Sequence, residues 1–245
     1  MLKATTTPQP ALSAPKSSLF KDLVSLVFPR VCTACGRSLH SHEDCICTLC
    51  HYRLPKTNYH LQAINPVVKL FWGRVPVRAA SAYYSFSKGG SVQKLVHQLK
   101  YRGRKEIGIA IGKFYGADLR ESETFCSSQV IIPVPLHAGK LKRRGYNQSD
   151  LFAQGLASGL DIPHDPANLV RVKASETQTR RSRFERWKNV ESVFKVSDPS
   201  RLEGKNILLV DDVVTTGSTL EACAQELLKV PGTTVSVATI AFAQL

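Results

Sequence analysis

The chain has 245 residues, 43% of them hydrophobic, which is enough for the core of one ordinary α/β domain and a small additional unit. Lys and Arg number 33 against 19 Asp and Glu, and the resulting formal charge of +14 predicts attraction to nucleic acids, nucleotides or pyrophosphate. No apolar run reaches the length of a membrane span, so we exclude membrane insertion.

The N-terminal residues 1–18 are rich in Ser, Thr and Pro and contain no acid. They lack a hydrophobic signal core, so we expect a disordered tail on a cytoplasmic protein, although the composition also resembles a transit peptide. Apolar residues from Leu19 to Phe28 predict a short amphipathic helix that ends at Pro29. With the cysteines that follow, residues 19–60 are interpreted as a helix plus a zinc-ribbon domain.

Five of the seven cysteines lie between residues 32 and 50. Cys32 and Cys35 form one C-x-x-C pair, and Cys47 and Cys50 form a second. Two such pairs supply four thiolates, enough for a closed tetrahedral zinc site, whose role would be structural because no position is open to water. Cys45 is an alternative ligand to Cys47. The basic residues nearby also leave open a ribbon that contacts nucleic acid.

The segment from Leu54 to Pro76 contains three prolines and predicts an irregular chain, so residues 61–78 are interpreted as a linker and residues 79–245 as the α/β domain. Hydrophobic patterns then predict a series of helices and strands. Strands are expected at Ala79–Phe86, Val130–Pro135, Leu169–Val172, Ser192–Val196, Ile207–Val210 and Thr233–Phe242; helices are expected at Ser91–Leu99, Lys105–Leu119, Gln148–Leu160 (with Asn147 as its cap) and Leu220–Lys229.

Two basic segments flank the later strands. The stretch after Val130–Pro135 has Lys140, Lys142, Arg143 and Arg144 within five positions, and it predicts either a pyrophosphate-binding lip or a solvated basic loop. The long polar segment from Lys173 to Asn189 predicts a mobile lid over a substrate.

The stretch from Ile207 to Leu220 is the most informative part of the sequence. A buried strand leads to Asp211 and Asp212, and a Thr/Gly/Ser loop then opens a helix. Hydroxyls and free amides at a helix N-terminus suit a phosphate, and carboxylates beside it suit the diol of a ribose. The predicted ligand is a sugar phosphate, and the alternative is a buried strand whose acids merely cap the next helix.

This stretch resembles the 5-phosphoribosyl-1-pyrophosphate (PRPP) signature of type I phosphoribosyltransferases. Further motifs make the chain, from about residue 19 to 243, similar to the ComF family, which is associated with competence and DNA uptake in bacteria. They are the cysteine pairs followed by Leu54-Pro55, Leu99-Lys100-Tyr101-Arg102-Gly103, Pro133 to His137, Lys142 to Gln148, and Thr177-Gln178 through Arg186 to Val190. The extra Cys45 and the tail before Leu19 depart from the family pattern.

The resemblance implies a type I phosphoribosyltransferase-like parallel sheet flanked by helices, with a small hood and an N-terminal zinc ribbon. It implies that Asp211 and Asp212 are catalytic and hold the ribose, with Mg²⁺ bound together with PRPP. PRPP-binding residues would be Val213, Val214, Thr215, Thr216, Gly217, Ser218 and Thr219. Pyrophosphate and lid residues would be Pro135, Leu136, His137, Lys140, Arg143, Arg144, Lys173 and Arg186.

Two functions follow as hypotheses. The first is a phosphoribosyltransferase that acts on PRPP or a related ribose phosphate, with an unidentified acceptor base, in DNA uptake or nucleotide metabolism. The second is a non-catalytic module that binds single-stranded DNA or nucleotides and works with the DNA-uptake machinery of natural transformation. Aromatic side chains for base stacking are sparse in the basic segments, with candidates at Tyr101, Tyr146, Phe184 and Trp187.

Overall fold

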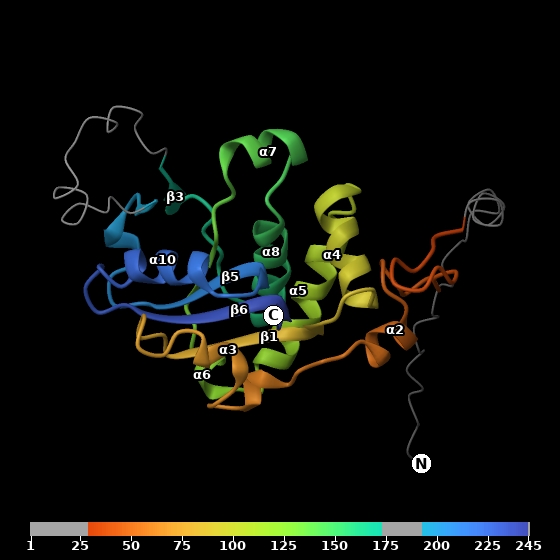
Figure 1. Cartoon of the computed structure of the whole chain (residues 1–245), viewed down its shortest axis with the longest axis horizontal. Helices are drawn as coiled ribbons and strands as arrows, with labels where there is room; N and C mark the ends of the chain where they lie inside the picture. The colour runs from red at the N-terminus through yellow and green to blue at the C-terminus, as the bar shows by residue number, and fades with distance from the viewer. Residues whose placement is uncertain (1–28, 173–192, 245) are drawn as a thin grey trace, which may run out of the picture.

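The fold centres on a four-stranded, wholly parallel sheet with the strand order β1-β6-β5-β2 (Figure 1). The computed structural model describes residues 29–172 and 193–244. The strands are β1 (Ala79–Phe86), β2 (Val130–Pro133), β5 (Asn206–Val214) and β6 (Thr234–Ala243). Side chains on both faces of β5 and β6 are buried, on one face in each of two hydrophobic cores. This burial explains the nearly continuous apolar sequences of the two strands.

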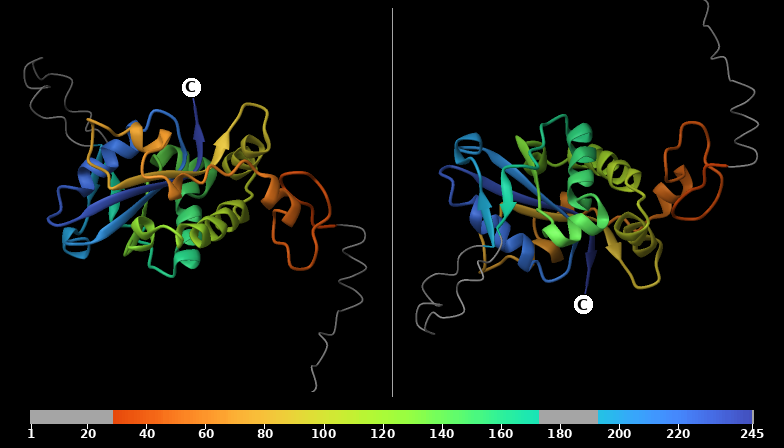
Figure 2. Two further views of the ribbon diagram at one scale, coloured as in Figure 1. Left: turned by 90° about the horizontal axis from the view of Figure 1, so that it is seen from below. Right: turned by 90° about the horizontal axis from the view of Figure 1, so that it is seen from above.

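Helices cover both faces of the sheet, and alternate residues of β5 separate two hydrophobic cores (Figure 2). Leu208 and Val210 face a core shared with α4 (Ser91–Tyr101), α5 (Glu106–Leu119), α6 (Glu123–Cys126) and α8 (Gln148–Leu160). Ile207 and Leu209 face the opposite core, which includes α3 (Pro66–Lys69), α10 (Ser218–Leu227) and an antiparallel pair, β3 (Leu169–Arg171) with β4 (Phe194–Val196). The arrangement is the predicted parallel sheet with flanking helices.

Helices α5 and α8 approach each other closely because glycines line their contact. A Cβ atom built on Gly155 would lie 2.2 Å from the carbonyl oxygen of Ile109 and 2.8 Å from Cα of Gly112. Gly159 and Gly116 repeat the contact further along the same helices. The close fit fixes α8, whose N-terminal turn reaches the carboxyl-terminal half of β5 through Ser149.

Several predicted elements are confirmed, and three expectations need correction. The irregular chain expected from Leu54 to Pro76 contains a 3-10 helix, η1 (Tyr59–Leu61), and α3, because apolar residues such as Val67 and Phe71 are buried against the sheet. The basic stretch is a helix, α7 (Ala138–Arg144), rather than a loop. Strand β5 does not end at Val210 but continues to Val214, since β6 keeps pairing with it.

The cysteine-containing segment lies beside α4 and α5 and is part of the same structure (Figure 1). It includes the short helix α2 (Thr48–Arg53). Cys45, Ile46 and Leu54 are buried in the core formed with α4 and α5. The expected N-terminal tail, the helix from Leu19 to Phe28 and the lid from Lys173 to Asn189 lie outside the described residues. None of the helices within 29–172 and 193–244 is both long and apolar enough to cross a membrane.

Candidate functional site

The acid pair lies where β5 loses one of its two neighbours. Strand β2 pairs with β5 as far as Pro133 opposite Val210, whereas β6 continues beyond it, with Thr239 opposite Asp211. The pairing closes with the backbone N–H of Val134, which donates to the carbonyl oxygen of Val210 at 2.9 Å. Asp211 and Asp212 therefore stand on a backbone that is held on one side and open on the other, at the carboxyl end of the sheet where ligands bind in α/β folds.

Asp211 is held by α8. Its Oδ1 atom accepts a hydrogen bond from Ser149 Oγ at 2.7 Å and another from the backbone N–H of Asp212 at 2.8 Å. Burial and the neighbouring Asp212 charge raise the pKa of Asp211 to about 7, against the hydrogen bonds and the positive charge of Lys100, which lower it. Near neutral pH the Asp211 carboxyl is therefore poised between its charged and neutral forms.

Asp212 has a different partner. Its Oδ1 atom lies 2.9 Å from Nζ of Lys100, in the last turn of α4, with both side chains largely withdrawn from solvent. The sequence analysis gave Lys100 no role at the acid pair. Its position in the Leu99-Lys100-Tyr101-Arg102-Gly103 motif was the available signal.

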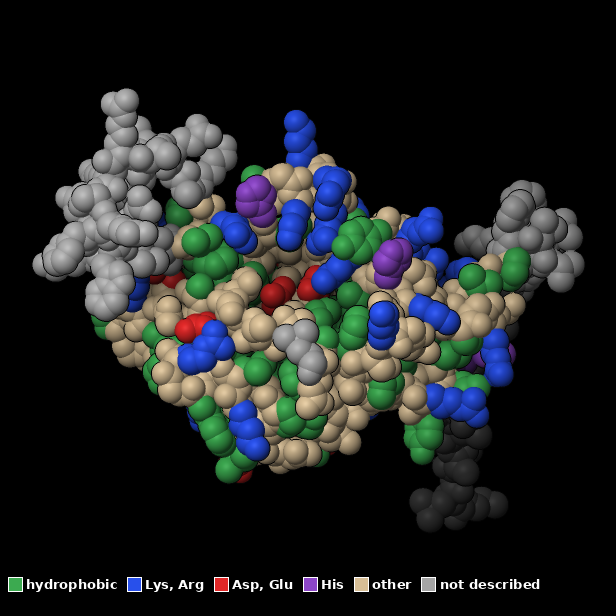
Figure 3. Space-filling model, in the orientation of Figure 1, with side chains coloured by type: hydrophobic (Ala, Val, Ile, Leu, Met, Phe, Trp, Pro, Cys, Tyr) green, Lys and Arg blue, Asp and Glu red, His purple; other side chains and the backbone are tan. Residues whose placement is uncertain are grey.

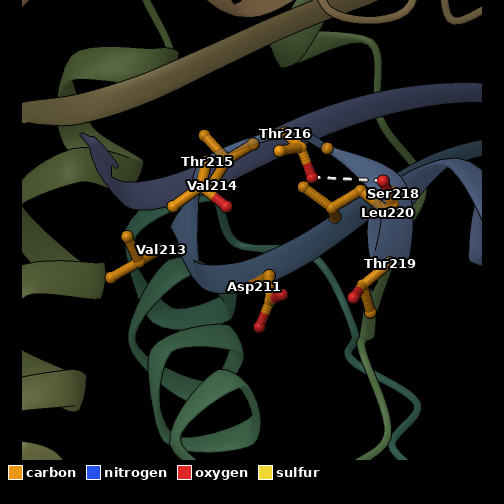
Figure 4. Close-up of a pocket in the computed structure, with 9 residues that line it drawn as sticks. Asp211, Val213, Val214, Thr215, Thr216, Ser218, Thr219 and Leu220 are labelled. Carbon is orange, nitrogen blue, oxygen red and sulfur yellow. Dashed lines mark hydrogen bonds between the residues drawn. The ribbon is translucent and has the colours of Figure 1, made fainter. Parts of the chain in front are cut away.

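The loop after β5 forms a hollow that is open to solvent (Figure 4). The hollow is lined by Asp211 and by residues from Val213 to Leu220. Gly217 is the N-cap of α10 and has φ +76°, a left-handed conformation that glycine adopts without strain. Thr216 and Ser218 hydroxyls lie 3.1 Å apart. Because Gly217 offers no side-chain cap, the first-turn amides of α10 are available to an anion.

Residues 70–74 contact this loop and the first turn of α10. The sequence analysis had interpreted them as part of a linker. Arg74 Nη1 donates to the carbonyl oxygens of Thr216 at 2.9 Å and of Leu70 at 3.1 Å. Arg74 also pairs with Glu221 in the first turn of α10. A Cβ atom on Gly217 would lie 3.3 Å from the Phe71 ring. No local sequence signal marked Arg74, since its partners in the loop and in α10 are about 140 residues away along the chain.

The basic helix α7 stands at the same end of the sheet, between β2 and α8 (Figure 1). Lys140, Lys142 and Arg143 are exposed, whereas Arg144 donates to Gln148 at 2.6 Å.

Among the residues expected to bind pyrophosphate, His137 caps α7, with Nδ1 accepting from the Gly139 amide at 3.1 Å. The half-buried Pro135 and Leu136 lead into this cap, and Lys173 and Arg186 lie outside the described residues.

The surface above the acid pair is predominantly basic. Figure 3 shows acidic side chains at the floor of a hollow overlooked by Lys and Arg side chains. Tyr101 is 60% exposed, and the centre of its ring lies 5.2 Å from the Arg144 guanidinium. Lys105 lies 5.1 Å from the Tyr146 ring, so two of the predicted stacking aromatics already contact cations.

The four predicted zinc ligands form one cluster. Sγ atoms of Cys32, Cys35, Cys47 and Cys50 all lie within 4.8 Å of one another, and those of Cys35 and Cys47 are 3.8 Å apart. Zinc–sulfur bonds of about 2.3 Å in tetrahedral geometry require sulfur–sulfur distances of roughly 3.8 Å, so the cluster fits a structural zinc ion. Cys45 points away, with Sγ 3.7 Å from the carbonyl oxygen of Glu106, and is not the alternative to Cys47.

Comparison with known proteins agrees with this architecture. The phosphoribosyl transferase domain family matches residues 147–244. The DNA utilization protein YhgH of Shigella flexneri is 33% identical over 84% of this chain and 88% of its own length. Competence protein ComFC of Bacillus subtilis is 29% identical over 82% of this chain and 78% of its own length.

Solved structures are more distant. The allosteric regulatory enzyme of purine biosynthesis matches 59% of this chain and 30% of its own, with 20% identity and a TM-score of 0.42. Adenine phosphoribosyltransferase from Leishmania tarentolae matches 63% of this chain and 74% of its own, with 17% identity and a TM-score of 0.35. The extent of the match to the Shigella protein, together with the cysteine cluster and the phosphoribosyl transferase domain, shows that the chain belongs to the ComF family.

Proposed function

We propose that this protein binds PRPP, or a related ribose phosphate, between the acid pair and the loop of residues 215–219. The observation that carries the proposal is the shared hollow: Asp211 lines the same opening as the Thr216 and Ser218 hydroxyls and the N-terminus of α10 (Figure 4). A ribose 5-phosphate has a diol at one end and a phosphate at the other. Carboxylates accept hydrogen bonds from the diol, while amides and hydroxyls at a helix N-terminus donate to the phosphate.

The donor set also suits the Mg²⁺ ion that accompanies PRPP in this class of enzyme. Asp211 and Asp212 offer carboxylate oxygens, and Mg²⁺ usually binds one or two carboxylates together with substrate phosphates. When bound, the ion would neutralise charge on the pyrophosphate. The exposed cations of α7, Lys140, Lys142 and Arg143, would attract the same group electrostatically.

The reaction proposed for the bound sugar is phosphoribosyl transfer. The bond between ribose C1 and pyrophosphate breaks with its electron pair leaving on the pyrophosphate, and a nitrogen of the acceptor base attacks C1 from the opposite face. The protein's part is to fix the ribose through Asp211 and Asp212, to hold the 5-phosphate on the loop, and to place positive charge near the leaving group. No covalent intermediate with the protein is required.

The test is thermal unfolding of the purified protein with PRPP and Mg²⁺ beside an Asp211→Asn, Asp212→Asn double variant. A ligand at 100 times its dissociation constant stabilises by about 2.7 kcal/mol, an upward shift of several degrees. We expect the shift in the wild type and its loss in the double variant. Glu203→Gln, at an exposed carboxyl away from the hollow, is the matched control. An equal shift in wild type and double variant would exclude this site.

A second function is favoured by the surface above the acid pair. The half-buried Arg144 of α7 lies against the largely exposed Tyr101, and the same helix carries exposed cations, a combination that suits the bases and backbone of single-stranded DNA. Relatives named for DNA utilization and competence support a role in DNA uptake. Binding of this kind should weaken steeply with salt. A fluorescent oligonucleotide whose affinity is unchanged between low and moderate salt, or in a Lys140→Glu, Arg143→Glu variant, would contradict it.

A further inference from the structure

The ion pair between Lys100 and Asp212 joins helix α4 to strand β5 of the sheet, next to Asp211 of the proposed site. Nζ of Lys100 lies 2.9 Å from Oδ1 of Asp212, and their side chains are 22% and 13% exposed. An ion pair this far removed from water is screened much less than a surface pair, so the lysine strongly compensates the Asp212 charge. The ammonium group thus occupies an oxygen that a ribose hydroxyl or a divalent cation would also require.

The backbone that carries Lys100 is fixed on both sides. The carbonyl oxygen of the preceding Leu99 accepts a hydrogen bond from Tyr146 Oη at 2.5 Å, and the Leu99 side chain is fully buried. One residue earlier, Gln98 Nε2 donates to the carbonyl oxygen of Thr33 in the cysteine-containing segment at 2.7 Å. The flexible part is therefore the lysine side chain, a long stem that can carry its point charge away without moving α4.

We propose that Lys100 is a positioning residue that serves as the resident counter-cation of Asp212 and sets how much divalent cation the ligand needs for binding. This inference rests on the proposed function. In the ligand-free protein, Lys100 holds Asp212 in place beside Asp211 and limits the repulsion between the two acids. When a sugar phosphate arrives with its cation, that cation competes with the ammonium for Asp212. Lys100 therefore raises the cation concentration at which the complex forms.

The experiment measures the thermal shift of the full-length protein at a fixed, saturating PRPP concentration while Mg²⁺ is titrated. Lys100→Met and Lys100→Gln remove the competing charge, and Lys100→Arg keeps it. The matched control is Lys56→Met, because Lys56 forms an ion pair of the same 2.9 Å length with Asp118 and has a similar exposure of 27%, away from the hollow. Two neutral variants are measured so that the test remains possible if one of them does not fold.

We expect the Mg²⁺ concentration at half-maximal shift to fall about threefold to tenfold in both neutral variants, as removal of one partly buried competing charge predicts. Lys100→Arg and Lys56→Met should stay within about twofold of the wild type. A purely structural role for Lys100 would lower the melting temperature without moving this midpoint. An unchanged or raised midpoint in the neutral variants would overturn the proposal while leaving PRPP binding intact. Absence of any shift in the wild type would overturn the proposed function and the role of Lys100 together.

Discussion

Asp211 should destabilise the ligand-free protein at neutral pH, and Asp211→Asn should relieve that penalty. The asparagine side chain has the same shape, and its oxygen can still accept the hydrogen bonds from Ser149 Oγ and the Asp212 amide. What it lacks is a charge that burial and Asp212 disfavour. A side chain that serves ligand binding but lowers the stability of the ligand-free protein is typical of functional sites.

The size of the effect follows from the pKa of Asp211, which the fold raises from 3.8 to about 7. Below pH 3.8 the carboxyl is protonated in both folded and unfolded chains and carries no penalty. As pH rises towards 7, the unfolded chain ionises first and gains stability at up to 1.36 kcal/mol per pH unit, so the folded state loses relative stability. Partial burial and the titration shared with Asp212 reduce this gradient, and we expect a total change of about 1 kcal/mol between pH 5 and 8.

The assay is urea unfolding of wild type and Asp211→Asn at several pH values from 5 to 8, without ligand. The variant's free energy of unfolding should exceed that of the wild type, and the difference should grow with pH and level off above about 7. Comparing the two proteins at each pH cancels acid effects on the cysteine cluster. A difference that is independent of pH, or that shrinks as pH rises, would refute the electrostatic account of Asp211.

Three further predictions concern the frame around the site. Gly155→Ala should destabilise the protein by about 3 kcal/mol or more in urea unfolding, because its methyl group would meet the α5 backbone, whereas Gly139→Ala should be tolerated. Cys35→Ser should abolish binding of one zinc ion per chain in elemental analysis, and Cys45→Ser should not. Arg74→Met should weaken PRPP binding in calorimetry by about tenfold or less through the loss of its loop contacts, and unchanged affinity would show that the loop is rigid without it.

Elements whose stability depends on local pattern were predictable from the sequence. The strand from Ala79 to Phe86 occurs at its expected bounds, and Asn147 caps α8 as expected, with Oδ1 accepting from the Ser149 amide. The spacing of the cysteine pairs likewise predicted the cluster that the structure contains. Each of these depends on a repeating pattern or on residues close in sequence, and such patterns can be read without knowledge of the fold.

Tertiary contacts explain what the sequence analysis missed. The region after Leu54 contains prolines and lacks clear periodicity, yet Phe71 is buried against the sheet and Arg74 reaches the loop of residues 215–219. The basic stretch before Gly145 becomes a helix because His137 supplies an N-terminal cap and Gly145 a left-handed C-terminal residue. Lys100 could not be assigned because its partner, Asp212, is more than 100 residues away in the chain.

The electrostatics of the acid pair answer a difficulty that the sequence raises. Two adjacent carboxylates should repel the phosphates of any ligand in the neighbouring loop. In the structure, the pKa of Asp211 is raised to about 7, so its charge is only partly present at neutral pH, and Lys100 compensates that of Asp212. The acid pair therefore contributes less negative charge than two free aspartates, while the exposed cations of α7 remain nearby. A polyanionic sugar phosphate can then approach a hollow that still provides carboxylate oxygens for its diol.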